Sequence, residues 1–171
     1  MSVSGWRPSG AHRYDVFLSY RWRTAQDQAI IFQLLLPQQL PGLRCFLDIS
    51  NLQAIEDLER YVAESKVVIA LLTGSMEKGV FKSDYFSSEN CLREMRATLG
   101  DRAKTIILLL ETDPDHGGGS LEAHQKDCPA DLRPDLFGES ARAKVVRWVR
   151  FKPARTASHK GDLSCTCDLI S

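Results

Sequence analysis

Few groups of reactive residues in the 171-residue chain have a spacing that supports a particular chemistry. His116, His124 and Cys128 share one segment, but their irregular spacing is weak evidence for zinc, whose sites usually show regular ligand pairs. Gly117–Gly119 lacks both the lysine of a phosphate loop and the spacing of a dinucleotide fingerprint, so a flexible turn is the better interpretation. The Gly-x-Ser-x-Gly elbow of α/β-hydrolases is also missing. We therefore expect no metal centre and no bound cofactor.

Polar and aromatic residues that follow two strand-like segments are more suggestive. Tyr20, Arg21 and Trp22 come soon after the apolar run Val16–Leu18, and Asp48 follows the second such segment. In open parallel sheets, ligands bind outside the carboxyl ends of the strands. These four residues are therefore candidate ligand contacts, and the indole of Trp22 is able to stack on an aromatic ring. The alternatives are packing of Trp22 on the next helix and capping of a turn by Asp48.

The position of these residues depends on a regular alternation of strands and helices. Continuous apolar runs of strand length suit a parallel sheet that is buried on both faces. Such runs predict strands around Val16–Leu18 and at 43–47, 66–72, 105–110 and 143–151. Apolar residues three, four and seven apart predict helices over 25–36 and 55–62, and another from a cap at Ser87 or Ser88 to Gly100. The alternation predicts a three-layer α/β fold with a five-stranded parallel sheet in flavodoxin-like order.

The connections are harder to interpret. Pro37 cannot donate a helical hydrogen bond, so the first helix is expected to end or kink there. Residues 73–86 contain Gly74 and Gly79 and predict a longer connection. Residues 113–138 are rich in Pro, Gly, Asp and His, which predicts a loop with at most one short helix. Two acidic residues next to apolar positions, Asp15 and Glu94, are expected to make structural hydrogen bonds or ion pairs.

Bulk composition is that of one globular domain. Hydrophobic residues make up 43% of the chain, and 22 Lys and Arg residues balance 22 Asp and Glu residues, so net charge favours neither nucleic acid nor anionic lipid. No apolar run is long enough to span a bilayer, and the polar start is unlike a secretory signal. We expect a cytoplasmic domain over 13–151, with a flexible leader at 1–12 and a flexible tail at 152–171. The odd count of five cysteines argues against a disulfide framework.

Six segments resemble, in the right order, the signature elements of Toll/interleukin-1 receptor (TIR) domains. Arg13–Arg21, RYDVFLSYR, is similar to the first TIR box, and Ser88–Met95, SENCLREM, resembles the helix that carries a Trp-Cys pair. The other similar segments are Cys45–Asp48, Ala63–Thr73, Lys104–Leu110 and, for the third box, Val145–Phe151. The resemblance covers about Arg13 to Phe151. It departs at Asn90, where the family has tryptophan, and in the loop after Asp48, which is short and lacks its usual glycine.

The resemblance implies a possible reaction. Some TIR domains hydrolyse NAD at the nicotinamide–ribose bond, through an oxocarbenium-like state that a nearby carboxylate stabilises. In the family that glutamate lies at the start of the second helix, where this chain has Glu56, with Asp57 as the alternative. Tyr20, Arg21 and Trp22 would then contact NAD as substrate. The other interpretation is that both carboxylates simply favour the dipole of the first helical turn.

The resemblance also implies signalling through protein association. TIR domains self-associate or pair with other TIR domains, through the loop after the second strand and neighbouring helices. Here the expected contact surfaces are Asp48–Ile55 and the exposed face of Ser88–Gly100. Oppositely charged patches would guide such association. A phosphate-accepting receiver domain has the same strand order, but it needs acidic residues where this chain has Ser19–Arg21 and Thr73.

Overall fold

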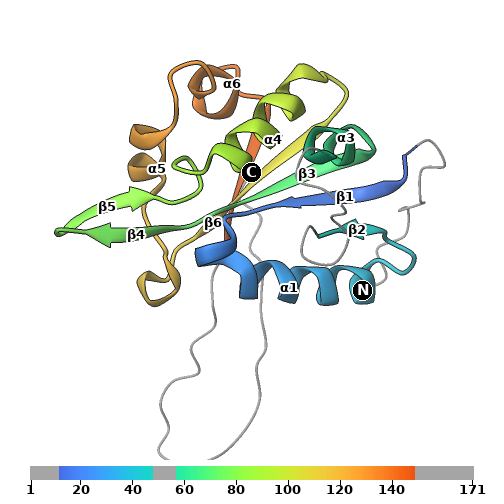
Figure 1. Cartoon of the computed structure of the whole chain (residues 1–171), viewed down its shortest axis with the longest axis horizontal. Coiled ribbons are helices and arrows are strands. Elements are labelled where there is room, and N and C mark those ends of the chain that lie inside the picture. Colours follow the sequence, from blue (N-terminus) through green and yellow to red (C-terminus); the bar gives the residue numbers. More distant parts are fainter. Residues whose placement is uncertain (1–11, 48–56, 149–171) are drawn as a thin grey trace, which may run out of the picture.

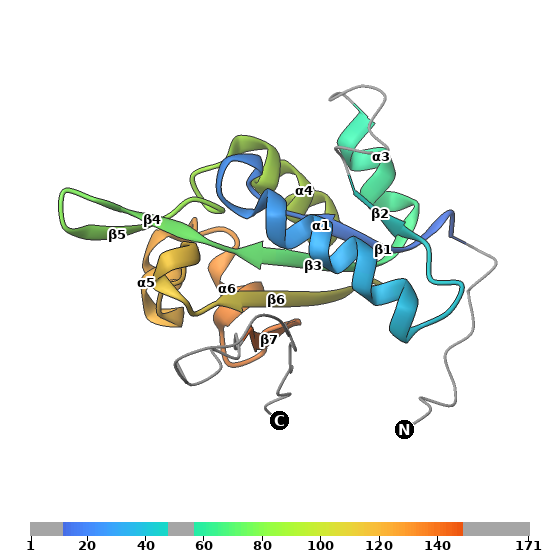
Figure 2. The same cartoon turned by 90° about the horizontal axis from the view of Figure 1, so that it is seen from below.

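A single parallel sheet organises the chain, as a computed structural model that describes residues 12–47 and 57–148 shows. Its strand order is β2-β1-β3-β6-β7, and every neighbouring pair is parallel. The strands are β1 (Tyr14–Ser19), β2 (Cys45–Phe46), β3 (Ser65–Leu72), β6 (Thr105–Glu111) and β7 (Ala143–Trp148). Helix α1 (Trp22–Gln39) covers one face, and α3 (Leu58–Ala63) and α4 (Glu89–Gly100) cover the other (Figures 1 and 2). The predicted three-layer, flavodoxin-like α/β fold is confirmed.

The core lies on both faces of this sheet because strand side chains alternate between them. On β1, Val16 and Leu18 pack toward α1, whereas Phe17 packs with Phe46 and Tyr61 on the α3 side. On β3, Ile69 and Leu71 pack toward α1, and Val68, Ala70 and Leu72 pack toward α3 and α4. An uninterrupted apolar run therefore supplies side chains to the cores on both faces of the sheet. This is why apolar and polar residues do not alternate in these strands.

An ion pair fixes the start of β1 beside β2. The carboxylate of Asp15 is almost fully buried and accepts hydrogen bonds from the backbone N–H, Nε and Nη2 of Arg44, at 3.0, 3.0 and 3.2 Å. The structural role expected for Asp15 is thus confirmed. β2 itself contains only Cys45 and Phe46, two residues of the predicted 43–47 strand.

The connection predicted at 73–86 contains a β-hairpin, which the sequence analysis did not predict. β4 (Gly74–Glu77) pairs antiparallel with β5 (Val80–Ser83), and the ribbon extends away from the main sheet (Figures 1 and 2). Lys78 and Gly79 close it with φ angles of 50° and 79°. Two positive φ values in a two-residue loop match a type I′ turn. The usual sequence signal for that turn is Asn-Gly. This chain has Lys-Gly at these positions, so the sequence did not indicate the turn.

Helical content between β6 and β7 is higher than predicted. Residues 112–142 contain a 3₁₀ turn, η2 (Pro114–His116), and two short helices, α5 (Leu121–Asp127) and α6 (Arg133–Phe137). The hydroxyl of Ser120 caps α5 by accepting from the Ala123 N–H at 3.2 Å. Pro37 does not end α1, which continues to Gln39, because a proline in the last turn removes a single helical hydrogen bond. Among the described residues, no helix is both long and apolar enough to cross a membrane.

Candidate functional site

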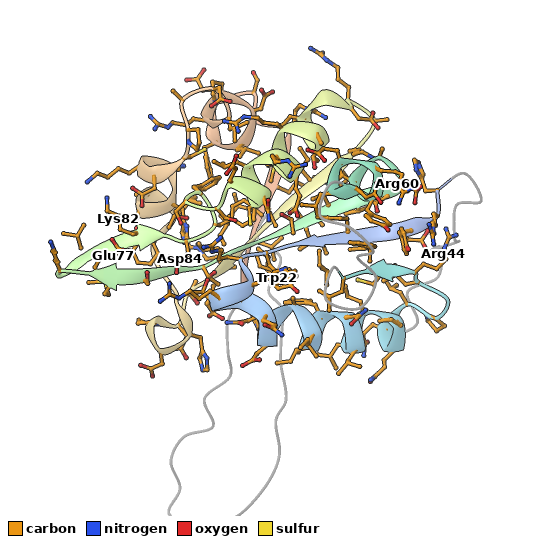
Figure 3. All side chains as sticks on the ribbon, in the orientation of Figure 1. Trp22, Arg44, Arg60, Glu77, Lys82 and Asp84 are labelled. Carbon is orange, nitrogen blue, oxygen red and sulfur yellow. The ribbon has the colours of Figure 1, made fainter. Side chains whose placement is uncertain are left out.

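The predicted ligand contacts after β1 occupy three different environments. Tyr20 is 3% exposed and belongs to the core under α1, so its ring faces nonpolar neighbours. Arg21 precedes α1 and is partly exposed. Trp22 is the first residue of α1 and is 50% exposed (Figure 3). The side chains accessible at this edge of the sheet are therefore the Arg21 guanidinium and the Trp22 indole.

Arg21 is attached to the beginning of α4. Its Nη1 donates to the hydroxyl of Ser88 at 3.1 Å. Ser88 is also the N-cap of α4, where its hydroxyl accepts from the Cys91 N–H at 3.4 Å. The cap thus holds a cation at the junction of β1, α1 and α4, in a position that suits an anionic or hydroxyl-bearing ligand group.

A buried polar cluster, made of Ser19, Tyr85 and Glu94, lies beside this junction. The Ser19 hydroxyl donates to Oε2 of Glu94 at 2.6 Å, and it lies 2.7 Å from the Tyr85 hydroxyl. Because the single Ser19 proton goes to Glu94, the Tyr85 hydroxyl is the donor to Ser19. Burial raises the pKa of Tyr85 well above its ordinary value, which keeps this donor protonated. The cluster joins the end of β1 to α4 and gives Glu94 the structural role expected for it.

The predicted catalytic carboxylates lie at the start of α3. Asp57 is the N-cap residue of this helix, and its Oδ2 lies 2.8 Å from Nη2 of Arg60 in a solvent-exposed pair. Glu56 and Asp48, the other acidic candidates, lie outside the described residues. The geometry therefore places Asp57 in an ion pair and leaves the assignment of Glu56 as a prediction.

The first turn of α3 is fixed to α4 by an ion pair with two hydrogen bonds. Nε and Nη2 of Arg93 donate to the two carboxylate oxygens of Glu59 at 2.8 and 2.9 Å. These hydrogen bonds lower the pKa of Glu59. A two-point contact of this kind fixes orientation as well as distance. Glu59 is three residues after Glu56, so α4 braces the helical turn that follows the predicted catalytic residue.

A hollow of about 470 Å³ opens on the other side of the edge, between α1, β4 and η2. Its lining includes Thr24, Gln28 and Gly74, with the acidic residues Asp27 and Asp115. The amide of Gln28 donates to the His116 carbonyl at 3.3 Å, which connects α1 to η2. Two carboxylates repel a pyrophosphate, so the Arg21 side of the edge is the more favourable place for a dinucleotide.

The three candidate zinc ligands, two histidines and a cysteine, have separate environments. His124 is fully buried, with Nδ1 2.7 Å from the Ser83 hydroxyl, whereas His116 is exposed. Cys128 is buried, and this burial raises its pKa to about 11. In the described ranges, no three His, Cys, Asp or Glu side chains come together as a metal site.

The glycine triplet is a turn, as predicted, but it is tightly packed. A Cβ added at Gly117 would lie 2.7 Å from the Gly74 carbonyl oxygen, and one at Gly119 would lie 2.3 Å from the Phe81 ring. At Gly118 the added atom would lie 2.4 Å from the backbone of the preceding residues. These contacts leave room only for glycine.

Comparison with known proteins gives structural matches only. No protein-family model and no curated protein matches the sequence. One similar solved structure comes from the Toll-related receptor TRR-2 of Hydra magnipapillata, at 17% identity and a TM-score of 0.46, covering 72% of this chain and 92% of that one. Another is from the activated Roq1 resistosome, at 20% identity and a TM-score of 0.46, covering 72% of each chain. Both structures are TIR domains.

The segments that resemble TIR boxes occupy defined places in this fold. The first TIR-like box forms β1 and its junction with α1, and the SENCLREM segment forms the cap and first turns of α4. Asn90, where TIR domains have tryptophan, is a partly exposed residue in the first turn of α4. The expected contact segment Asp48–Ile55 lies outside the described residues.

Three residues that shape the edge escaped the sequence analysis: Ser88 as the partner of Arg21, Arg93 as the brace of α3, and Tyr85 beneath β1. Their partners lie 67, 34 and 66 residues away in the sequence. A capping signal was visible at Ser88, but no local pattern reveals a contact across that distance.

Proposed function

We propose that this chain is a TIR-type signalling module that acts by associating with further TIR domains, of its own kind or of another. The observation that carries the proposal is the joint placement of the TIR-like segments. The end of the first box and the start of the SENCLREM helix meet through the Arg21–Ser88 hydrogen bond at one edge of a parallel sheet. The equal numbers of acidic and basic residues support this proposal, because two copies meet without net repulsion.

Sedimentation velocity of the full chain over a range of concentrations tests the proposal. We expect a reversible, concentration-dependent increase in sedimentation coefficient. Leu52→Lys, within the expected interaction loop, should reduce this increase. Lys126→Glu, at an exposed position on α5, serves as the matched control and should leave it unchanged. A chain that stays monomeric at every concentration, alone and with other TIR domains, contradicts the proposal.

Hydrolysis of NAD is the second candidate function. It is favoured by the bidentate Arg93–Glu59 pair, which braces the turn after Glu56, and by the cation and half-exposed indole at the same edge of the sheet. In this proposal the Glu56 carboxylate stabilises positive charge on the ribose as the nicotinamide bond breaks, and water completes the hydrolysis. Arg21 and Trp22 contact the dinucleotide.

Nicotinamide release from NAD at high protein concentration tests this activity. We expect release by the unmodified chain and its loss in Glu56→Ala, because the oxocarbenium-like state then has no carboxylate beside it. Asp57→Ala is the matched variant. If Asp57→Ala releases nicotinamide and Glu56→Ala does not, the catalytic carboxylate is Glu56. If only Glu56→Ala still releases nicotinamide, the catalytic carboxylate is Asp57. A chain that self-associates but releases no nicotinamide supports the interaction module and contradicts the proposed NAD hydrolysis.

A further inference from the structure

The β4–β5 hairpin is firmly held at its base. The Phe81 ring packs edge-on against the His124 ring at 5.1 Å. The Ser83 N–H donates to Oδ2 of Asp127 at 2.8 Å, and the Gly74 N–H donates to the Gly117 carbonyl at 2.8 Å. Both outer edges of the ribbon are therefore occupied at the base.

The tip of the hairpin is open. Met76 is 67% exposed and Val80 is 52% exposed, on a ribbon that extends beyond the other elements (Figures 1 and 2). Glu77 pairs with Val80 next to the turn, and Met76 pairs with Phe81. In a two-residue hairpin the pair beside the turn exchanges hydrogen bonds, so the backbone groups of the next pair point outward.

The contact at the base supports this orientation. Gly74, two residues before Met76, indeed donates outward, to Gly117. Met76 is the next outward-facing position on β4, and its backbone makes no hydrogen bond to another described residue. An unpaired strand edge of this kind is a template for pairing with another strand.

We propose that the outer edge of β4 pairs with β4 of a second copy of this chain. The two strands run antiparallel about a two-fold axis at Met76 and form a four-stranded ribbon. Such an axis makes the contact isologous, so that each copy uses the same surface. This inference rests on the self-association proposed above and adds to it a defined contact surface.

In this register, apolar side chains meet on one face of the ribbon and charged side chains approach one another on the other face. On one face, Met76 lies beside Met76 of the second copy, and in each copy Phe81 is the residue paired with Met76 on the neighbouring strand. On the other face, Glu77 of the second copy lies beside Ser75, which is small, with Lys82 one strand further away. Glu77 and Lys82 are both exposed at the hairpin (Figure 3), so this register brings Lys82 of one copy toward Glu77 of the other across the short Ser75 side chain. The like charge nearest to this contact is Asp84, whose Oδ1 accepts from the Ser75 hydroxyl at 3.1 Å.

Disulfide trapping tests the register. In a Cys165→Ser, Cys167→Ser background, oxidation of Met76→Cys should give a covalent dimer, because directly paired residues have Cα atoms about 5.5 Å apart, within disulfide range. Val80→Cys is the matched control. It is similarly exposed but lies on the outer strands of the four, so it should remain monomeric under the same oxidation.

Sedimentation measurements test the contact without a cross-link. Met76→Pro removes the outward N–H but no bond within the hairpin, and it should weaken association by about tenfold, whereas Met76→Thr, which keeps the N–H, should weaken it less. Glu77→Lys and Lys82→Glu should each weaken association, and the double variant should restore it. Circular dichroism confirms that each variant is folded. The hairpin contact is wrong, and the signalling module stands, if the unmodified chain associates, Met76→Pro associates equally well and oxidised Met76→Cys gives no covalent dimer. A monomeric chain overturns both.

Discussion

Replacement of Glu94 by alanine is expected to lower the free energy of unfolding by about 3 kcal/mol. Glu94 is 4% exposed and is the acceptor at the end of the hydrogen-bond chain from Tyr85 through Ser19. Without the carboxylate, the Ser19 hydroxyl keeps its desolvation cost but loses its acceptor. For a chain of this size, such a loss lowers the melting temperature by roughly 6–12 °C.

Thermal and urea unfolding of paired variants measure this effect. Glu94→Gln retains an acceptor for Ser19 and should cost about half as much as Glu94→Ala, since a charged acceptor is replaced by a neutral one. Glu89→Ala is the control on the same helix, because Glu89 is exposed and contributes only through the helix dipole. Equal losses for Glu89→Ala and Glu94→Ala would show that the buried chain of hydrogen bonds does not stabilise the fold.

Acidification is expected to destabilise the fold through His124. Burial lowers the pKa of His124 to about 4, from an ordinary value of 6.5. Between these two values the unfolded chain binds a proton that the folded chain does not, so stability falls as the pH falls. The stability is fully present above pH 6.5, and about 2.5 kcal/mol of it is lost by pH 4.5.

Urea unfolding at several pH values between 7.5 and 4.5 isolates this contribution. His124→Gln does not titrate and retains a polar partner for the Ser83 hydroxyl, so its stability should fall less steeply with pH than that of the unmodified chain. His116→Gln, at an exposed position, should follow the unmodified chain. Identical slopes for the unmodified chain and His124→Gln would mean that another group causes the acid response.

The sheet could be predicted because its signals are local. The runs at β1 and β3 are continuous, strand-length and apolar, and they serve cores on both faces. The α4 cap at Ser88 and the end of that helix at Gly100 were also visible in the sequence. Each of these features depends on residues within one turn or one strand, which is the range over which sequence patterns are informative.

The candidate site was predicted less completely because it is assembled from distant contacts. Arg21 and Trp22 were predicted as ligand contacts from their place after β1, and that role stays a prediction. The attachment of Arg21 to Ser88 and of Glu59 to Arg93 depends on how α3 and α4 pack. Tyr20 illustrates the same limit. The order of residues after a strand does not tell which side chain turns into the core and which remains at the edge.

The packing of Gly117–Gly119 divides the β6–α5 loop into two kinds of position. The glycines contact Gly74, the loop backbone and Phe81 too closely to accept a side chain. Asp115 and His116 line the neighbouring hollow, yet both are exposed. We therefore expect substitutions to be tolerated at Asp115 and His116 and not at the three glycines. The charge and shape of the hollow can therefore be changed by substitution while the path of the backbone around it stays fixed.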